Sequence, residues 1–132
     1  MIDFETTFMR KFIAFNKQIN IYLNHFPNSE KYALSQSIRV DVYRVFDLIV
    51  EGQKRYHKKT TLTDLDISFD RLKAKLLLAY HLGYFSFKDG KTDDKNPMTI
   101  AEKRYSTISL MASELGKFIG SWIKKIKEEN KW

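Results

Sequence analysis

Apolar side chains recur every three or four residues along almost the whole of this chain. Steps of three and four keep side chains on one face of an α-helix, whereas a half-buried strand requires alternation with a period of two. No organised alternation of that kind occurs, so the pattern predicts an all-α protein. The first apolar series consists of Phe4, Phe8, Phe12, Phe15, Ile19, Tyr22 and Phe26.

Proline and capping residues divide the pattern into separate helices. Pro27 closes the first helix, because the residue before a proline avoids the α-helical region. Asn28 or Ser29 is expected to begin the second helix, and Thr61 or Thr63 to cap the third, since these residue types are favoured at helix N-caps. The second helix has its apolar face at Leu34, Ile38, Val42, Val45, Ile49, Gly52 and Tyr56.

The rest of the chain supplies the third and fourth helices. Gly83 is a suitable C-cap for the third, and residues 86–98 form the longest predicted loop. Thr99 and Glu102 have the spacing of a capping box and are expected to begin the fourth helix. Four amphipathic helices predict an antiparallel up-down four-helix bundle, as one domain over residues 1–132. The third and fourth apolar faces comprise Leu65, Phe69, Leu72, Leu76, Ala79 and Gly83, then Ile108, Met111, Leu115, Phe118, Trp122 and Ile126.

Small residues recur every fourth position in the last helix, at Ala112, Gly116 and Gly120. Each mid-helix glycine costs about 1 kcal/mol relative to alanine, so a packing reason is expected. We predict that these three residues, beside Trp122, let a neighbouring helix approach closely. A membrane-surface helix is the alternative, but the apolar face continues upstream to Ile108, as a bundle core does.

Basic residues exceed acidic residues, giving a net charge of +7. The excess lies in residues 27–59 and 100–132, each with seven basic and four acidic side chains. In an up-down bundle the ends of the second and fourth helices share one pole with the start of the first. We predict a nucleic-acid-binding surface there, with Tyr56 and Trp132 among the cations. A solvated basic end is the alternative, because lysine also favours helix C-termini. The predicted surface consists of Lys54, Arg55, Lys58, Lys59, Lys124, Lys125, Lys127, Arg10 and Lys11.

Residues that carry catalysis or bind metals are sparse. The chain has no cysteine, which excludes disulfides and thiolate zinc sites. His25, His57 and His81 fall in different segments without metal-ligand spacing, and no glycine-rich phosphate loop occurs. We therefore expect no enzyme activity, no catalytic or metal-binding residue and no cofactor. The sequence contains no signal-peptide pattern or membrane-spanning run, so a cytoplasmic protein that does not associate with membranes is expected.

Three segments resemble a known family. ELGKFIGSWIK at 114–124 is similar to the last helix of the Avd proteins, the accessory variability determinants of diversity-generating retroelements. HFPNSEKYALSQSIR at 25–39 resembles the wider four-helix-bundle superfamily, which includes proteins encoded in intervening sequences of ribosomal RNA genes. Residues 60–84 also resemble the Avd-like branch. The long 86–98 loop departs from the tight connection of many relatives.

The resemblance implies a non-enzymatic accessory protein. Avd proteins form homopentameric rings, bind a reverse transcriptase and help it copy template RNA into error-prone complementary DNA. A ribosomal-RNA-associated bundle of the intervening-sequence type and a purely structural oligomer are the alternatives. The aromatic content, 14% of residues, also exceeds what one thin bundle requires, so some aromatic side chains are expected at subunit contacts. The candidates are Tyr22, Tyr43, Tyr80, Tyr105 and Trp122.

Overall fold

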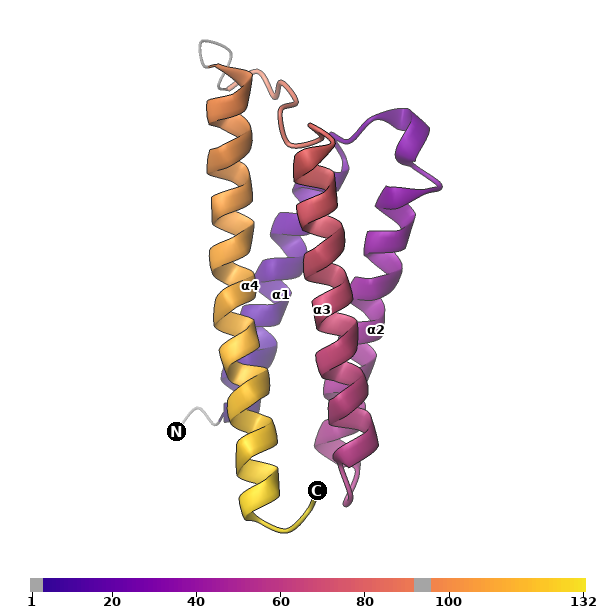
Figure 1. Ribbon diagram of the computed structural model, residues 1–132, viewed down its shortest axis with the longest axis vertical. Coiled ribbons are helices and arrows are strands. Elements are labelled where there is room, and N and C mark those ends of the chain that lie inside the picture. The colour runs from indigo at the N-terminus through magenta and orange to yellow at the C-terminus, as the bar shows by residue number, and fades with distance from the viewer. Residues whose placement is uncertain (1–3, 92–95) are drawn as a thin grey trace.

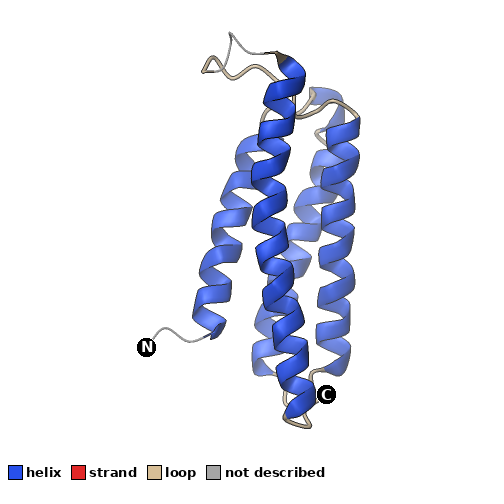
Figure 2. Cartoon of the chain, turned by 60° about the vertical axis from the view of Figure 1, so that its left-hand side comes forward, coloured by secondary structure: helices blue, strands red, loops and turns tan. Residues whose placement is uncertain are grey.

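The computed structural model describes residues 4–91 and 96–132, and these residues form an antiparallel four-helix bundle (Figure 1). Successive helices run in opposite directions, and each packs against its two neighbours around one core (Figure 2). The described residues contain no strand, so the predicted fold class is confirmed. The elements are α1 (Phe4–Leu23), the 3₁₀ helix η1 (Asn28–Glu30), α2 (Leu34–Lys54), α3 (Lys59–His81) and α4 (Pro97–Glu128).

Aromatic rings fill much of the core. Phe8, Phe12 and Phe15 of α1 are at most 1% exposed, as the spacing of the first apolar series predicts. The Phe15 ring centroid lies 6.0 Å from that of Phe69 on α3, and Phe8 meets Trp122 of α4 edge-on at 6.0 Å. Burying a phenylalanine side chain stabilises the fold by roughly 1.5–3 kcal/mol. The period of the sequence therefore identifies the principal packing face of α1 correctly.

The predicted start of α2 is wrong by several residues. Asn28 belongs to the 3₁₀ helix η1, and the α-helix begins only at Leu34. The non-α-helical residues between Leu23 and Leu34 let Phe26 insert into the core, where its ring lies 5.5 Å from that of Phe85. Glu30 is also engaged, accepting a hydrogen bond from the Tyr84 hydroxyl at 3.0 Å. These tertiary contacts outweigh the local capping preference of Asn28 and Ser29.

The predicted cap residues of the next two helices are also wrong. α3 begins at Lys59, and Thr61 donates a hydrogen bond to Glu51 of α2 at 3.1 Å instead of capping its own helix. α4 begins at Pro97, and the side chain of Asn96 accepts a hydrogen bond from the backbone N–H of Met98 at 2.8 Å. The Asn96 side chain thereby provides a partner for a first-turn backbone N–H that has none within the helix, and the fixed φ of Pro97 suits the first helical position.

For the same reason, the capping box predicted at Thr99 and Glu102 lies inside α4, two residues beyond its first residue. Part of the predicted 86–98 loop, residues 92–95, lies outside the described residues.

Two helices end in the same hydrogen-bonded motif. After α3, Gly83 has φ +80°, and the N–H of Tyr84 donates to the carbonyl of Ala79 at 3.0 Å. After α4, Asn130 has φ +58°, and the N–H of Lys131 donates to the carbonyl of Ile126 at 3.1 Å. This left-handed cap favours glycine, or asparagine as a substitute. The predicted role of Gly83 is confirmed.

The segment that follows α3 is held by Arg104 of α4. Its buried guanidinium donates to the carbonyls of Phe85 at 2.8 Å and Phe87 at 2.6 Å, and pairs with Asp89 at 3.3 Å. The same guanidinium lies 3.7 Å from the centroid of the Phe87 ring, a favourable cation–π distance. The first part of the long connection is therefore anchored to the bundle.

Close helix packing occurs at a different glycine from the two predicted. Ala112 and Trp122 are buried, as expected. A β-carbon at Gly120 would meet no atom of another described element within 4 Å, and one at Gly116 would only reach the Phe69 ring at 4.0 Å. Among the described residues the expected close approach at Gly116 and Gly120 is therefore absent, because Gly120 is exposed and Gly116 leaves room for a β-carbon beside Phe69.

Gly52 of α2 is the glycine that permits a close contact. A β-carbon there would lie 2.8 Å from Cη2 of Trp122 and 3.1 Å from Cδ2 of Leu62. Both neighbouring side chains are buried, so neither can move away without disturbing the core.

These contacts predict opposite effects of alanine at two glycines. Gly52→Ala should lower the melting temperature, because overpacking costs about 1–3 kcal/mol and exceeds the gain in helix propensity. Gly120→Ala should raise it, since about 1 kcal/mol of propensity is gained without a clash. Thermal unfolding followed by circular dichroism tests both. A rise for both variants would show that Trp122 yields easily.

Candidate nucleic-acid interface

The predicted basic surface lies at the end of the bundle where α2 and α4 finish and α1 and α3 start (Figure 1). We call this end the basic pole and define it by residues 51–59 and 124–132. A backbone hydrogen bond joins its two segments, from the N–H of Lys58 to the carbonyl of Lys131 at 3.0 Å. The predicted convergence of the two basic segments is therefore present, although not every predicted residue takes part in the exposed surface.

Lys58 is buried and holds the turn between α2 and α3. It is 9% exposed, and its ammonium group donates to the carbonyls of Gly52 and Arg55 at the end of α2. Burial lowers its pKa below the ordinary value, while the charge of Glu5 acts in the opposite direction. The prediction that Lys58 contacts nucleic acid has to be corrected, because its donors already satisfy the last carbonyls of a helix.

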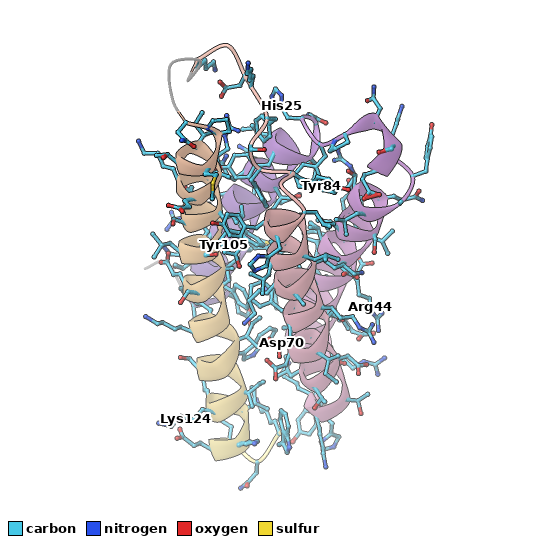
Figure 3. All side chains as sticks on the ribbon, turned by 45° about the horizontal axis from the view of Figure 1, so that its top comes forward. His25, Arg44, Asp70, Tyr84, Tyr105 and Lys124 are labelled. Carbon is cyan, nitrogen blue, oxygen red and sulfur yellow. The ribbon has the colours of Figure 1, made fainter. Side chains whose placement is uncertain are left out.

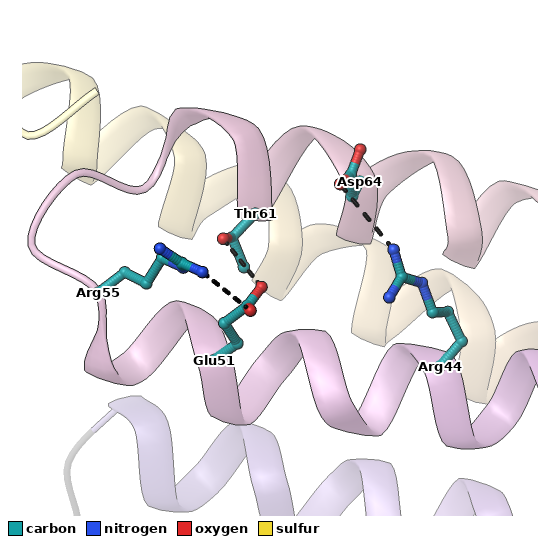
Figure 4. Close-up of polar contacts among 5 residues, drawn as sticks. All are labelled: Arg44, Glu51, Arg55, Thr61 and Asp64. Carbon is teal, nitrogen blue, oxygen red and sulfur yellow. Dashed lines mark hydrogen bonds and ion pairs between the residues drawn. The ribbon is translucent and has the colours of Figure 1, made fainter.

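Glu51 of α2 contacts both Arg55, another residue of the predicted surface, and Thr61 of α3 (Figure 4). Arg55 lies 3.3 Å from Glu51 Oε1, and Thr61 donates to the second oxygen, Oε2. Further along the same helix pair, Arg44 lies 4.0 Å from Asp64. Arg55 therefore remains exposed, but its charge is partly compensated.

The remaining predicted lysines of the pole are exposed, and none forms an ion pair with a carboxylate of residues 4–91 or 96–132. Lys124 projects from the end of α4 (Figure 3), and Lys127 places its ammonium group 4.8 Å from the Trp132 ring centroid. Exposed ammonium groups without an ion-pair partner can follow a phosphate backbone without selecting a base sequence. The unpaired lysines of the pole are Lys54, Lys59, Lys124, Lys125 and Lys127.

Arg10 and Lys11 make smaller contributions than predicted. Lys11 Nζ lies 2.6 Å from a carboxylate oxygen of Glu114 on α4, so its charge is compensated. Arg10 is exposed and lines a groove between α1 and α2, together with Lys17 and Gln53. It therefore lies on the flank of the bundle, in the wall of this groove, and not among the lysines of α4.

The two aromatic residues predicted at the pole have different roles. Tyr56 is 71% exposed beyond the end of α2, so it does not extend the buried face of that helix as expected. Trp132 is half-buried against the core, beneath Lys127. Lys131 also lies at the pole, 4.0 Å from Glu129. It was not among the predicted residues because it comes after the end of the last helical pattern.

No metal-binding arrangement occurs among the described residues, where no three His, Asp or Glu side chains converge. His25 stacks against the Phe87 ring at 4.4 Å, and His57 lies edge-on to Tyr56 at 4.8 Å. None of the described helices has the length and apolar content to cross a membrane.

Comparison with known families identifies the chain at the level of a family. A model of the bAvd-like family matches residues 6–126, which includes nearly all of the bundle. The chain belongs to the bAvd-like family. No curated protein and no solved structure was found to match it. The match to the bAvd-like family confirms the resemblance inferred from the three sequence segments.

The two adjacent lysines of this bAvd-like protein should respond differently to substitution. Lys58→Met keeps the apolar stem but leaves the carbonyls of Gly52 and Arg55 without their donor, which should cost about 1–3 kcal/mol of unfolding free energy. Lys59→Met alters an exposed side chain and should change the unfolding free energy by at most about 0.5 kcal/mol. Urea unfolding measures this free energy for both variants. Equal effects would contradict the capping role of Lys58.

Proposed function

We propose that this protein is a non-enzymatic accessory factor of a reverse transcriptase, and that it binds template RNA and complementary DNA through the basic pole. Membership of the bAvd-like family supports the polymerase partner. The cluster of unpaired lysines at the ends of α2 and α4 supports nucleic-acid binding and is the observation that carries the proposal. Phosphate contacts of this kind supply affinity without base recognition, which suits a factor that must follow a template of changing sequence.

The corrected surface gives a direct test of nucleic-acid binding. Lys59→Gln with Lys124→Gln should weaken binding of single-stranded RNA and DNA alike, with unrelated sequences remaining within roughly tenfold of each other. The slope of log affinity against log salt should decrease in magnitude by about 1.4, because each single-strand phosphate contact contributes about 0.7. Filter-binding titrations at several salt concentrations measure both quantities.

The matched control is Lys88→Gln with Lys91→Gln, which removes the same charge from the segment after α3. This control should leave the salt slope nearly unchanged. Equal losses from both variants would mean that only net charge matters, and no loss from the pole variant would contradict the proposed interface.

We also propose that the protein assembles with copies of itself, in the five-fold ring implied by the resemblance to Avd proteins. Tyr22 and Trp122 of the predicted contact residues are buried in the core, and Tyr80 stacks on Tyr105 at 4.7 Å within the protomer. Tyr43 remains, at 58% exposure. It belongs to an exposed apolar row on α2 that supports a subunit contact. That row comprises Val40, Tyr43, Phe46 and Val50.

Two arginine substitutions test the assembly. Tyr43→Arg with Val50→Arg should convert the oligomer to a 15.7 kDa monomer with unchanged helicity, because charge would be buried in the contact. Leu110→Arg is the control, since this exposed residue of α4 has Ser106, Thr107 and Glu114 as its helical neighbours. Sedimentation velocity measures the mass. A wild-type monomer at micromolar concentration would contradict the proposal.

A further inference from the structure

A cavity of about 390 Å³ lies at the opposite end of the bundle from the basic pole, between the end of α1, the 3₁₀ helix η1 and the start of α2. We call it the η1 cavity. Its apolar wall includes Leu23, Phe26 and Pro27, and its other lining residues are polar or aromatic. A volume of this size lies within the range of small-molecule sites, which extends from about 300 to 1,000 Å³.

The cavity carries positive charge that no acidic lining residue offsets. Lys31 and Arg39 both line it, and its lining contains no carboxylate. The neighbouring Glu30 is held elsewhere by the Tyr84 hydroxyl. Arg39 donates to two neutral amides, Asn20 at 2.6 Å and Asn24 at 3.2 Å, and forms no ion pair among the described residues. These amides fix the guanidinium without neutralising it, so the cavity favours an anionic ligand.

An exposed aromatic ring stands at the same cavity. Tyr32 is 81% exposed, and the ammonium group of Lys31 lies 5.4 Å from its ring centroid. Such a ring beside a cation offers a stacking surface for a planar, electron-rich ligand next to a binding position for phosphate.

The cavity also contains unused hydrogen-bonding groups. The Ser35 hydroxyl lines the cavity, forms no hydrogen bond with the described residues and keeps access to solvent. The side-chain amides of Asn28 and Gln36 line the cavity and are likewise without a partner in the described chain. Amides and hydroxyls recognise the Watson–Crick edge of an unpaired base. The N-cap of α2 is Ala33, which provides no side-chain cap for the first N–H groups of that helix.

We propose that the η1 cavity binds one unpaired nucleotide of a single strand. The phosphate lies between Lys31 and Arg39, the base stacks on Tyr32, and its edge meets Gln36. A base in a duplex cannot stack on the ring, so the cavity selects single strands. A phosphorylated peptide would use the cations but leave Tyr32 without a planar partner, and the nucleotide accounts for both features. The inference rests on the proposed nucleic-acid role and gives the protein a second contact at its other pole.

The test uses the full chain and a single-stranded RNA with one 2-aminopurine, together with the duplex of the same sequence. Tyr32→Ala should weaken single-strand binding about tenfold and abolish the quenching of 2-aminopurine that stacking produces. Tyr32→Phe should retain both, and duplex binding should not change for either variant. Lys31→Gln should reduce the salt slope by about 0.7, whereas Tyr32→Ala should leave it unchanged.

The outcomes separate this inference from the proposed function. If Tyr32→Ala binds the single strand as tightly as the wild type while Lys59→Gln with Lys124→Gln weakens it, the cavity inference is overturned and the basic pole stands. If only the tyrosine variant loses binding, the cavity stands and the pole interface is overturned. A free nucleoside monophosphate that binds to the cavity when no strand does would overturn the single-strand ligand, as would equal losses of duplex and single-strand binding in Tyr32→Ala.

Discussion

The junction around Lys58 determines how the basic pole is built. One side chain provides donors for the last carbonyls of α2, and its backbone N–H holds the C-terminal segment through Lys131. Gly52 accepts one of these hydrogen bonds, and its lack of a side chain lets Trp122 of α4 reach α2. The ends of three helices are therefore fixed relative to one another. Lys58 is thus a buried structural cation, whereas the lysines around it are exposed and unpaired.

The two ends of the bundle differ in chemistry. At the basic pole, long lysine side chains extend into solvent, an arrangement suited to a flexible charged backbone. At the opposite end, Arg39 is held by amides and Arg104 by backbone carbonyls, beside aromatic rings that lie in fixed positions. Fixed planar groups can distinguish one ligand shape from another, whereas solvated ammonium groups mainly supply charge. The two ends are thus suited to different aspects of the nucleic-acid binding that we propose.

Helix number, helix faces and family follow from local sequence patterns, and the errors at the starts of α2 and α3 concern positions where distant residues compete. The packing face of α1 was predictable because all seven apolar residues of the series from Phe4 to Phe26 are spaced three or four positions apart. The start of α2 was not, because insertion of Phe26 among Tyr84 and Phe85 depends on residues more than fifty positions away. Thr61 likewise looks like a cap in isolation, yet Glu51 provides a better partner across the helix pair.

The sequence by itself determined an all-α bundle, the convergence of its basic segments at one pole and the left-handed cap at Gly83, because periodicity, chain direction and backbone sterics are local properties. Only the tertiary structure decided which lysine is buried, which glycine contacts a neighbouring helix and which tyrosines lie outside the core. The burial of Lys58 depends on the turn between α2 and α3, and the other two depend on the rotation of one helix about its axis against the next. That rotation is set by the combined packing of four helices and appears in no single segment.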